Sequence, residues 1–382
     1  MIKQDIPKIR FYSYQGSWTE NRIADIVKIS AGGDVDKVKL KESGKYPVIA
    51  NALTNKGIVG FYEDYKVKAP AVTVTGRGDV GYAVARHENF TPIVRLLTLQ
   101  SEKIDVDYLE NQINSMRILN ESTGVPQLTA PQLGNYKVYH PEIEEQSAIG
   151  TLFRTLDDLL SSYKDNLANY QSLKATMLSK MFPKAGQTVP EIRLNGFDGE
   201  WEVKKLKNVV QINPKSALPE KFKYIDLESV VGTRINKIRE EYKETAPSRA
   251  QRLAEKGDIF YQTVRPYQKN NYLFKLDDVD YVFSSGYAQL RPKRTSCDSD
   301  FLLTLLQDNK FLSKVLDRCT GTSYPAINAK DLVEISIVIP KVEEQQAIGS
   351  YFSNLDNLIN SHQEKISQLE TFKKKLLQDM FI

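Results

Sequence analysis

The chain contains one stretch of sequence twice, and the two copies align without a gap at a separation of about 199 residues. The first copy spans residues 126–182 and centres on Pro-Glu-Ile-Glu-Glu-Gln-Ser-Ala-Ile-Gly. The second spans residues 325–381 and centres on Pro-Lys-Val-Glu-Glu-Gln-Gln-Ala-Ile-Gly. A duplication of this kind predicts two similar structural units that are related by a pseudo-twofold axis.

Each copy predicts a long helix. Residues 143–182 lack proline, no glycine follows Gly150, and apolar residues alternate at the spacings that form the seam of a coiled coil. The seam residues are Ile149, Phe153, Leu156 and Leu160 in the first copy and Ile348, Phe352, Leu355 and Ile359 in the second. A helix of about 40 residues is roughly 60 Å long. Because an apolar stripe of that length is unstable in water, we expect the two helices to pack on each other in antiparallel orientation.

Two lysines interrupt the predicted seam at equivalent positions, Lys174 and Lys373. A lysine can bury its aliphatic stem while its charged end reaches a partner or the solvent. We therefore expect either such a role or simple tolerance of a polar residue at these positions.

The regions that precede the helices predict two heads whose ends match and whose middles differ. Pro7-Lys-Ile-Arg and Trp18 match Pro190-Glu-Ile-Arg and Trp201, at a separation of about 183 rather than 199 residues. The predicted domains are a first head at 1–142, a first helix at 143–182, a second head at 183–341 and a second helix at 342–382. Short β-branched runs predict strands at 46–49, 57–62, 71–75, 223–227, 257–261, 272–275 and 281–284, and apolar spacing predicts helices at 106–119 and 301–316. Each head is thus expected to be an α+β domain with an irregular β-sheet.

Composition leaves several classes of protein open and argues against others. The chain is 26% charged with a formal net charge of +4, which permits a polyanionic partner without requiring one. Its two cysteines, Cys297 and Cys319, predict free thiols, and its three histidines lack metal-ligand spacing. We find no signal peptide and no membrane span, so we expect a cytoplasmic protein.

The motifs that suggest catalysis have simpler interpretations. Residues 76–81 match the formal pattern G-x-G-x-x-G, but the next residues predict a strand instead of the helix that a dinucleotide site needs. We therefore expect a hairpin with an exposed arginine. The paired glutamates at 144–145 and 343–344 begin long helices, where carboxylates favour the helix dipole. The sequence contains no P-loop. We expect a non-catalytic chain without a cofactor of its own.

Binding to double-stranded DNA remains, because two heads and a mildly basic charge suit the reading of two separated half-sites. Loops rich in Gly, Asn and Gln supply the candidate DNA-contacting residues, which are Lys56, Arg77, Arg86, Arg265, Lys269, Asn270 and Asn271. Arginine reads guanine and asparagine reads adenine, whereas lysine mostly meets phosphate. Two polar loops closed by proline add Thr123 and Thr322 as phosphate contacts. A solvated surface residue, or a plain turn for each loop, is the alternative at every one of these positions.

The repeated Pro-x-x-Glu-Glu-Gln-x-Ala-Ile-Gly, followed by Phe153-Arg-Thr-Leu-Asp or Phe352-Ser-Asn-Leu-Asp, resembles the conserved helical regions of type I restriction-modification specificity subunits. Short motifs in the heads, such as Thr75-Gly-Arg-Gly-Asp-Val-Gly and Ser285-Gly-Tyr-Ala, resemble sequences of that family as well. The resemblance implies that each head is a target recognition domain for one half of a bipartite DNA sequence. It also implies that the helices set the spacer between the two halves.

The same resemblance implies the partners of the chain. Two methyltransferase subunits would dock on the helices and adjoining head surfaces, and two restriction subunits would join for cleavage. S-adenosylmethionine, ATP and magnesium would belong to those partners, and the methylated base would be an adenine in each half-site. Alternatives are the specificity module of a type IIB-like methylase-nuclease, a coiled-coil adaptor protein, and an enzyme with an unrecognised site in one head.

Overall fold

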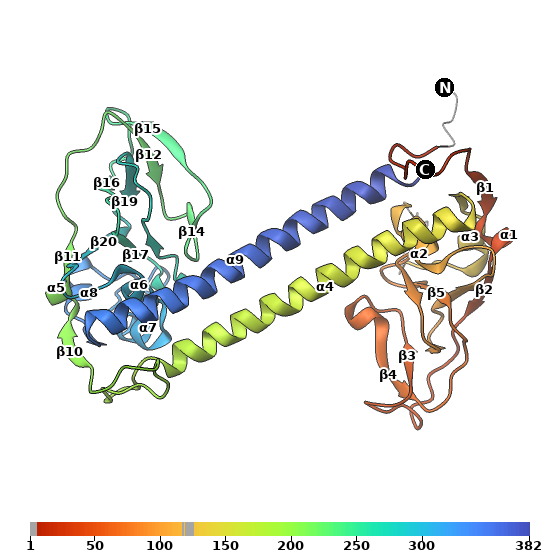
Figure 1. Ribbon diagram of the computed structural model, residues 1–382, viewed down its shortest axis with the longest axis horizontal. Helices are drawn as coiled ribbons and strands as arrows, with labels where there is room; N and C mark the ends of the chain where they lie inside the picture. The colour runs from red at the N-terminus through yellow and green to blue at the C-terminus, as the bar shows by residue number, and fades with distance from the viewer. Residues whose placement is uncertain (1–5, 117, 119–125) are drawn as a thin grey trace. The chain divides into compact units, whose positions relative to one another are not determined.

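The computed structural model describes residues 6–116, 118 and 126–382, and the chain divides into two compact units. Unit 1 comprises residues 1–165 and 364–382, and unit 2 comprises residues 166–363. Helix α4 (Ile143–Lys180) passes from unit 1 into unit 2, and helix α9 (Val342–Asp379) passes back (Figure 1). The two predicted long helices are therefore confirmed. Within the described part of the chain, no helix has the length and apolar character needed to cross a membrane.

The head of unit 1 contains two sheets and a strand pair (Figure 1). The four-stranded antiparallel sheet has the order β2 (Lys28–Ala31), β8 (Leu97–Gln100), β5 (Ala71–Val74), β6 (Ala83–Arg86). The smaller sheet has the order β4 (Ile58–Tyr62), β3 (Tyr46–Ile49), β7 (Thr91–Pro92), and β1 (Thr19–Arg22) pairs with β9 (Lys137–His140). Its helices are α1 (Ile23–Ile26), η1 (Thr54–Gly57), α2 (Val106–Ser115) and α3 (Ala130–Gly134).

The head of unit 2 has the same kinds of sheet and strand pair as the head of unit 1, with additional strands. A four-stranded sheet has the order β11 (Val210–Ile212), β20 (Tyr287–Pro292), β17 (Ile259–Gln262), β18 (Tyr272–Leu273), and β10 (Glu202–Lys205) pairs with β21 (Ser336–Ile339). The other strands are β15 (Arg239–Tyr242), β12 (Lys221–Ile225), β19 (Tyr281–Ser284) and β16 (Ala250–Leu253) in one sheet, and β13 (Val230–Val231) with β14 (Arg234–Ile235). Its helices are α5 (Leu206–Val209), η2 (Pro266–Gln268), α6 (Ser299–Gln307), α7 (Asn309–Leu316) and α8 (Ala329–Val333). Both heads are α+β, as predicted.

Two helix predictions for the heads need correction. The single helix predicted at 301–316 is two helices, because Asp308 is extended (φ −66°, ψ 140°) and its side chain caps α7 by accepting from the Lys310 N–H. An aspartate in this conformation is a strong N-cap, so it starts a new helix although the apolar pattern continues. The helix predicted at 106–119 ends earlier, because Met116 is extended (φ −84°, ψ 148°).

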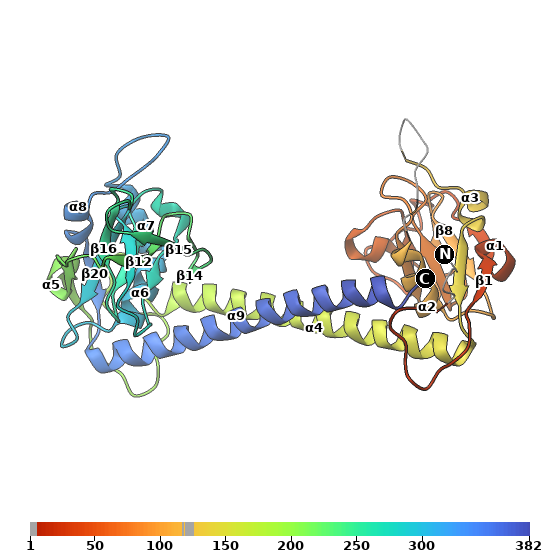
Figure 2. The same cartoon turned by 90° about the horizontal axis from the view of Figure 1, so that it is seen from above.

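The seam of each long helix is buried, as predicted. All of its residues, Ile149, Phe153, Leu156, Leu160, Ile348, Phe352, Leu355 and Ile359, are at most 9% exposed. Inside each unit α4 and α9 lie side by side (Figure 1 and Figure 2), and the residue numbers of contacting side chains rise along one helix as they fall along the other. The antiparallel packing is therefore confirmed within each unit.

The two seam lysines bind aspartates of the opposite helix. Lys373 pairs with Asp157 in unit 1, and Lys174 pairs with Asp356 in unit 2. Both aspartates belong to the repeated Leu-Asp that follows each seam phenylalanine. Each lysine thus places a charge-assisted hydrogen bond beside the apolar seam, which explains why the seam accepts it.

The end of each long helix completes an aromatic core. In unit 1 the Phe381 ring lies 5.4 Å from Tyr108 and 5.6 Å from Phe153, measured between ring centroids. In unit 2 the Phe182 ring takes the equivalent place, 5.7 Å from Phe301 and 6.2 Å from Phe352. The repeated Met-Phe therefore closes the core of the head at the far end of its own helix.

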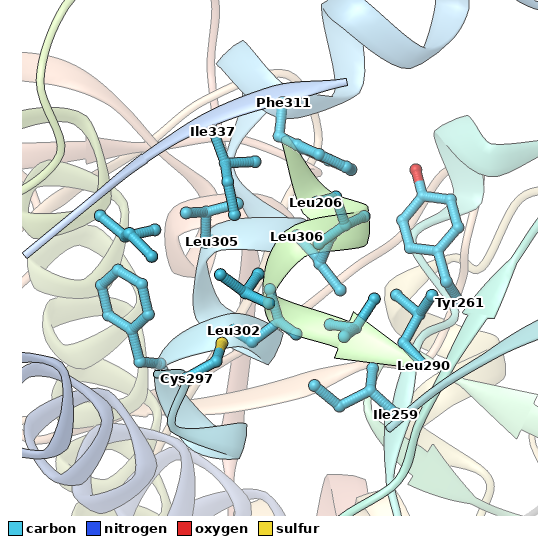
Figure 3. Close-up of a cluster of buried hydrophobic side chains, with 14 of the residues drawn as sticks. Leu206, Ile259, Tyr261, Leu290, Cys297, Leu302, Leu305, Leu306, Phe311 and Ile337 are labelled. Atoms are coloured by element: carbon cyan, nitrogen blue, oxygen red, sulfur yellow. The ribbon is translucent and has the colours of Figure 1, made fainter. Parts of the chain in front are cut away.

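Aliphatic side chains pack beside these rings in the core of unit 2. Figure 3 shows Leu302 and Leu306 of α6 packed towards Ile259 of β17 and Leu290 of β20. Cys297 lies in this cluster, and burial raises the pKa of its thiol to about 12. A thiol with that pKa is protonated at neutral pH and behaves as a small apolar side chain. Both cysteines are free, as predicted.

In each head, the arginine of the repeated Pro-x-Ile-Arg near its start binds a glutamate of the repeated Glu-Glu-Gln at the start of the long helix. Arg10 donates from Nε and Nη2 to both carboxylate oxygens of Glu145, at 2.7 Å each. Arg193 makes the same pair with Glu344 at 2.8 and 2.6 Å. We expected these glutamates to serve the helix dipole; they do begin the helices, but each is buried and its direct partner is a half-buried arginine. Removing one member of such a pair leaves a buried charge without compensation.

The repeated glycine lets each long helix touch the start of a head helix. A Cβ on Gly150 would lie 2.6 Å from Asp105 Oδ1 and 2.9 Å from the Tyr108 nitrogen. A Cβ on Gly349 would lie 2.7 Å from the Phe301 nitrogen. Only glycine fits at this separation, which explains its presence in both copies.

We expect Phe381→Ala to lower the free energy of unfolding of unit 1 by about 3 kcal/mol, because truncation leaves a cavity in the aromatic core. Phe372→Ala is the matched control, since its ring is 50% exposed on the same helix, and should cost less than about 1 kcal/mol. Urea unfolding followed by Trp18 fluorescence in a Trp201→Phe background measures both. Equal costs would show that unit 1 does not need the end of α9.

Candidate nucleic-acid interface

In each head, a turn that carries a predicted arginine lies beside the polar loop that carries a predicted threonine. In unit 1, Arg77 forms an isolated bridge with Gln127, and the Leu128 N–H donates to the Gly76 carbonyl at 2.9 Å. In unit 2, Val264 forms the equivalent bridge with Ala326. Segments that are far apart in the sequence are thus joined in the same way in both heads.

The arginine of unit 2 is held by this loop. The Arg265 N–H donates to the Pro325 carbonyl at 2.8 Å, and the guanidinium lies 4.3 Å over the ring of Tyr324. Arg265 has a left-handed backbone (φ 54°, ψ 55°), a conformation that costs free energy for any residue other than glycine. Stacking on an aromatic face leaves the edges of the guanidinium, with its N–H donors, available to a ligand.

Of the two predicted threonines, Thr322 lies among the described residues and Thr123 does not. Thr322 is exposed on the loop that Thr320 and Ala326 close by two backbone hydrogen bonds of 2.9 and 3.0 Å. Thr123 lies outside the described residues. In unit 2 the loop that carries Thr322 is therefore the loop that holds Arg265 through Pro325. In unit 1 the turn of Arg77 is a hairpin between β5 and β6, as predicted, and Arg77 is exposed.

Arg86 has a structural role in unit 1. Its side chain is 8% exposed, and it donates to Thr73 Oγ1 at 3.0 Å and to the Lys56 carbonyl at 2.7 Å. Burial lowers the pKa of Arg86 to about 10. The guanidinium ties η1 to the β5–β6 hairpin, while the side chain of Lys56 is exposed.

The remaining predicted residues of unit 2 brace the turn that carries Arg265. Lys269 Nζ donates to the Gln307 carbonyl at 2.7 Å and to Asn309 Oδ1 at 2.6 Å, and burial lowers its pKa. Asn270 Oδ1 accepts from the Gly232 N–H at 2.8 Å. The buried Asn271 accepts from the Gln262 N–H at 2.9 Å. These three side chains form hydrogen bonds within the head. They therefore stabilise the turn that carries Arg265.

Sequence reasoning missed Arg95. It is exposed at the turn between β7 and β8, where Val94 (φ 50°) and Arg95 (φ 60°) are both left-handed. Asn51 links this turn to that of Arg77, because its amide donates to the Val94 carbonyl at 2.5 Å and accepts from the Gly76 N–H at 2.7 Å. A left-handed valine has no sequence signal, since β-branched residues disfavour that conformation.

The chain matches the family model of the type I restriction modification DNA specificity domain twice, over residues 15–169 and 198–371. The chain belongs to this family. Each match takes in most of one head and most of the long helix that follows it. The chain is thus a DNA-specificity subunit of the type I restriction-modification class.

Individual specificity subunits agree with this assignment. The type I restriction enzyme MjaVIII specificity subunit of Methanocaldococcus jannaschii is 24% identical over 400 residues, covering 94% of this chain and 91% of that protein. The HindI specificity subunit of Haemophilus influenzae is 28% identical over 179 residues, covering 46% of this chain and 36% of that protein. The crystal structure of the S subunit from M. genitalium matches with a TM-score of 0.71 over 99% of both chains, at 16% identity. That last similarity establishes the shared fold.

Unit 1 of this specificity subunit also contains a polar cavity of about 640 Å³ between α2 and the two long helices. Several of its charged groups are paired: Asp107 binds His87 at 2.8 Å and Arg154 at 3.3 Å. Glu110 differs from them, because burial raises its pKa to about 7 although a backbone hydrogen bond at Ala85 opposes the rise. The carboxylates of Asp157 and Asp107 add to the rise, and Lys373 opposes it. In the described part of the chain, no group of His, Cys, Asp and Glu is arranged to hold a metal ion.

The raised pKa of Glu110 predicts a pH-dependent stability. With a pKa near 4.5 when unfolded and about 7 when folded, the folded state binds the proton more tightly. The resulting stabilisation is complete below about pH 4.5 and is lost as the pH rises through 7. We expect Glu110→Gln to raise the free energy of unfolding of unit 1 above pH 7, by at most about 3 kcal/mol, and to leave it unchanged at pH 4.

Urea unfolding of unit 1 across this pH range, followed by Trp18 fluorescence in the Trp201→Phe background, tests the effect. Glu88→Gln is the control, because Glu88 is exposed on the adjoining loop. The same pH profile in the two variants and the parent would contradict the assignment to Glu110.

Proposed function

We propose that each unit of the chain reads one half of a bipartite DNA target for a type I restriction-modification complex. The observation that carries this proposal is the arginine-bearing turn joined to a polar loop by the same type of bridge in both heads. The two heads share a frame but differ in strands β13, β14 and β16 and in the residues of their loops. Two different surfaces on one frame suit the two different halves of an asymmetric target.

The chemistry of these loops suits base and phosphate contacts. Arg77, Arg95 and Arg265 lie on three turns, two in unit 1 and one in unit 2, and a guanidinium donates two parallel hydrogen bonds to guanine. The hydroxyl of Thr322, the backbone N–H groups of its loop and the amine of Lys56 suit phosphate oxygens. Arg86, Lys269, Asn270 and Asn271 position these groups through the hydrogen bonds described above. Thr123 is retained as a proposed contact from its place in the repeated sequence.

The long helices are proposed to set the spacer between the half-sites and to dock two methyltransferase subunits. Two restriction subunits would complete the complex, and S-adenosylmethionine, ATP and magnesium would bind to the partners. We propose that this chain itself is not catalytic and that adenine is the base modified in each half. The names of the relatives support the type I assignment over a type IIB-like module or a coiled-coil adaptor.

The methylome of the host tests the function directly. With the gene intact, we expect a bipartite N6-methyladenine motif with a spacer of fixed length, and we expect deletion of the gene to abolish it. Deletion of an unrelated specificity gene, where one exists, is the control. An unchanged methylome in cells that make both this chain and its methyltransferase would refute the proposal.

We expect Arg77→Ala and Arg265→Ala to relax specificity at one base position each, in different halves of the target. Loss of a bidentate contact to guanine removes about 1–3 kcal/mol of discrimination. Methylome sequencing of cells that carry each variant would show a degenerate position in one half and an intact second half. Arg294→Ala, which removes an exposed arginine outside both turns, is the control. Degeneracy in the same half for both variants would contradict the assignment of one half to each unit.

A further inference from the structure

Unit 2 contains an open cleft of about 400 Å³ at the foot of the loop that carries Thr322. Thr320 and Ala326, which close that loop, line one side of the cleft, and Val264, next to Arg265, lines it as well. Two arginines, Arg252 and Arg318, complete the lining together with polar groups. The cleft is therefore continuous with the proposed DNA-contacting loop.

Arg252, in strand β16, has a side-chain N–H group without a hydrogen-bond acceptor. Its Nε is buried and has no hydrogen-bond partner among the described residues. A β-bulge between Ala250 and Arg252 shifts the register of β16 against β19, a device that redirects side chains next to functional sites. Burial lowers the pKa of Arg252, and no carboxylate offsets that effect. A buried guanidinium N–H without an acceptor costs free energy unless a ligand supplies one.

The cleft has a net positive charge. Arg318 follows α7 and is exposed, so two arginines line one cleft. None of the described residues that line the cleft is acidic. The carboxylate of Asp331 is close to the rim, where the Asn328 amide holds it. Two arginines without a lining carboxylate form a site for an anion with several oxygen acceptors.

We propose that this cleft, the Arg252 cleft, binds one phosphate of the DNA backbone through Arg252 and Arg318. The inference rests on the proposed function, because the phosphate belongs to the DNA that unit 2 reads. A phosphodiester offers acceptors to both guanidinium groups and satisfies the buried Nε of Arg252. The neighbouring loop with Arg265 and Thr322 would then contact the nucleotides beside that phosphate.

A backbone contact differs measurably from a base contact. A phosphate contact weakens binding to all sequences alike when it is lost, and it lowers the slope of log affinity against log salt by about 1. A base contact changes specificity at one position instead. The proposal therefore predicts a loss that is independent of sequence.

The test uses the complex of this chain with its methyltransferase subunits. Binding to a fluorescent duplex with the target, and to a duplex with the half-site of unit 2 scrambled, is measured over a series of salt concentrations. We expect Arg252→Gln and Arg318→Gln each to weaken binding to both duplexes about tenfold. We also expect each variant to lower the salt slope by about 1.

Arg294→Gln is the matched control, because it removes the same charge from an exposed position outside the cleft. Arg318 is exposed, so its variant tests the cleft even if Arg252→Gln reduces stability. Variants that bind like Arg294→Gln, or a loss confined to the intact half-site, would overturn the inference. If the parent complex shows no salt-dependent DNA binding, the proposed function itself fails; if the parent binds and the variants match it, only the cleft assignment fails.

Discussion

The burial of one phenylalanine at the end of each long helix is the contact on which both units depend. Phe381 enters the core of unit 1, and Phe182 enters the core of unit 2. Because α4 begins in unit 1 and ends in unit 2, while α9 does the reverse, each core needs a segment from the other half of the chain. Unit 1 is consequently discontinuous in sequence, and its core is complete only after the last residues of α9 have packed.

The other repeated residues serve the same junction between head and helix. The Arg10–Glu145 pair binds the first residues of the head to the start of α4, and Gly150 allows that helix to approach α2. Unit 2 repeats both devices with Arg193, Glu344 and Gly349. These groups are buried or in close contact, where a substitution is costly. The exposed loops lack such constraints and are free to differ between the two heads.

Several features of the candidate interface were predictable one at a time but not in combination. The turn at Arg77 and the polar loop before α8 were each recognisable from glycine, proline and polar residues. Their contact depends on bridges between segments that are far apart in the sequence, such as Val264 with Ala326. The burial of Arg86 and Asn271 was not predictable, because their hydrogen-bond partners lie on other elements of the heads, Lys56 in η1 and Gln262 in β17. Arg95 was missed because the left-handed turn that carries it has no sequence signal, and Arg252 was missed because segments far apart in the sequence form its cleft.

The sequence by itself determined the duplication, the two long helices with their seam, the α+β class of the heads and the family. Those features are periodic or repeated, so local pattern and self-comparison reveal them. The tertiary structure decided where the helix at 301–316 breaks, which seam positions pair a lysine with an aspartate, and which arginines face the solvent. These outcomes depend on capping, burial and hydrogen bonds between distant segments, which a linear pattern does not record.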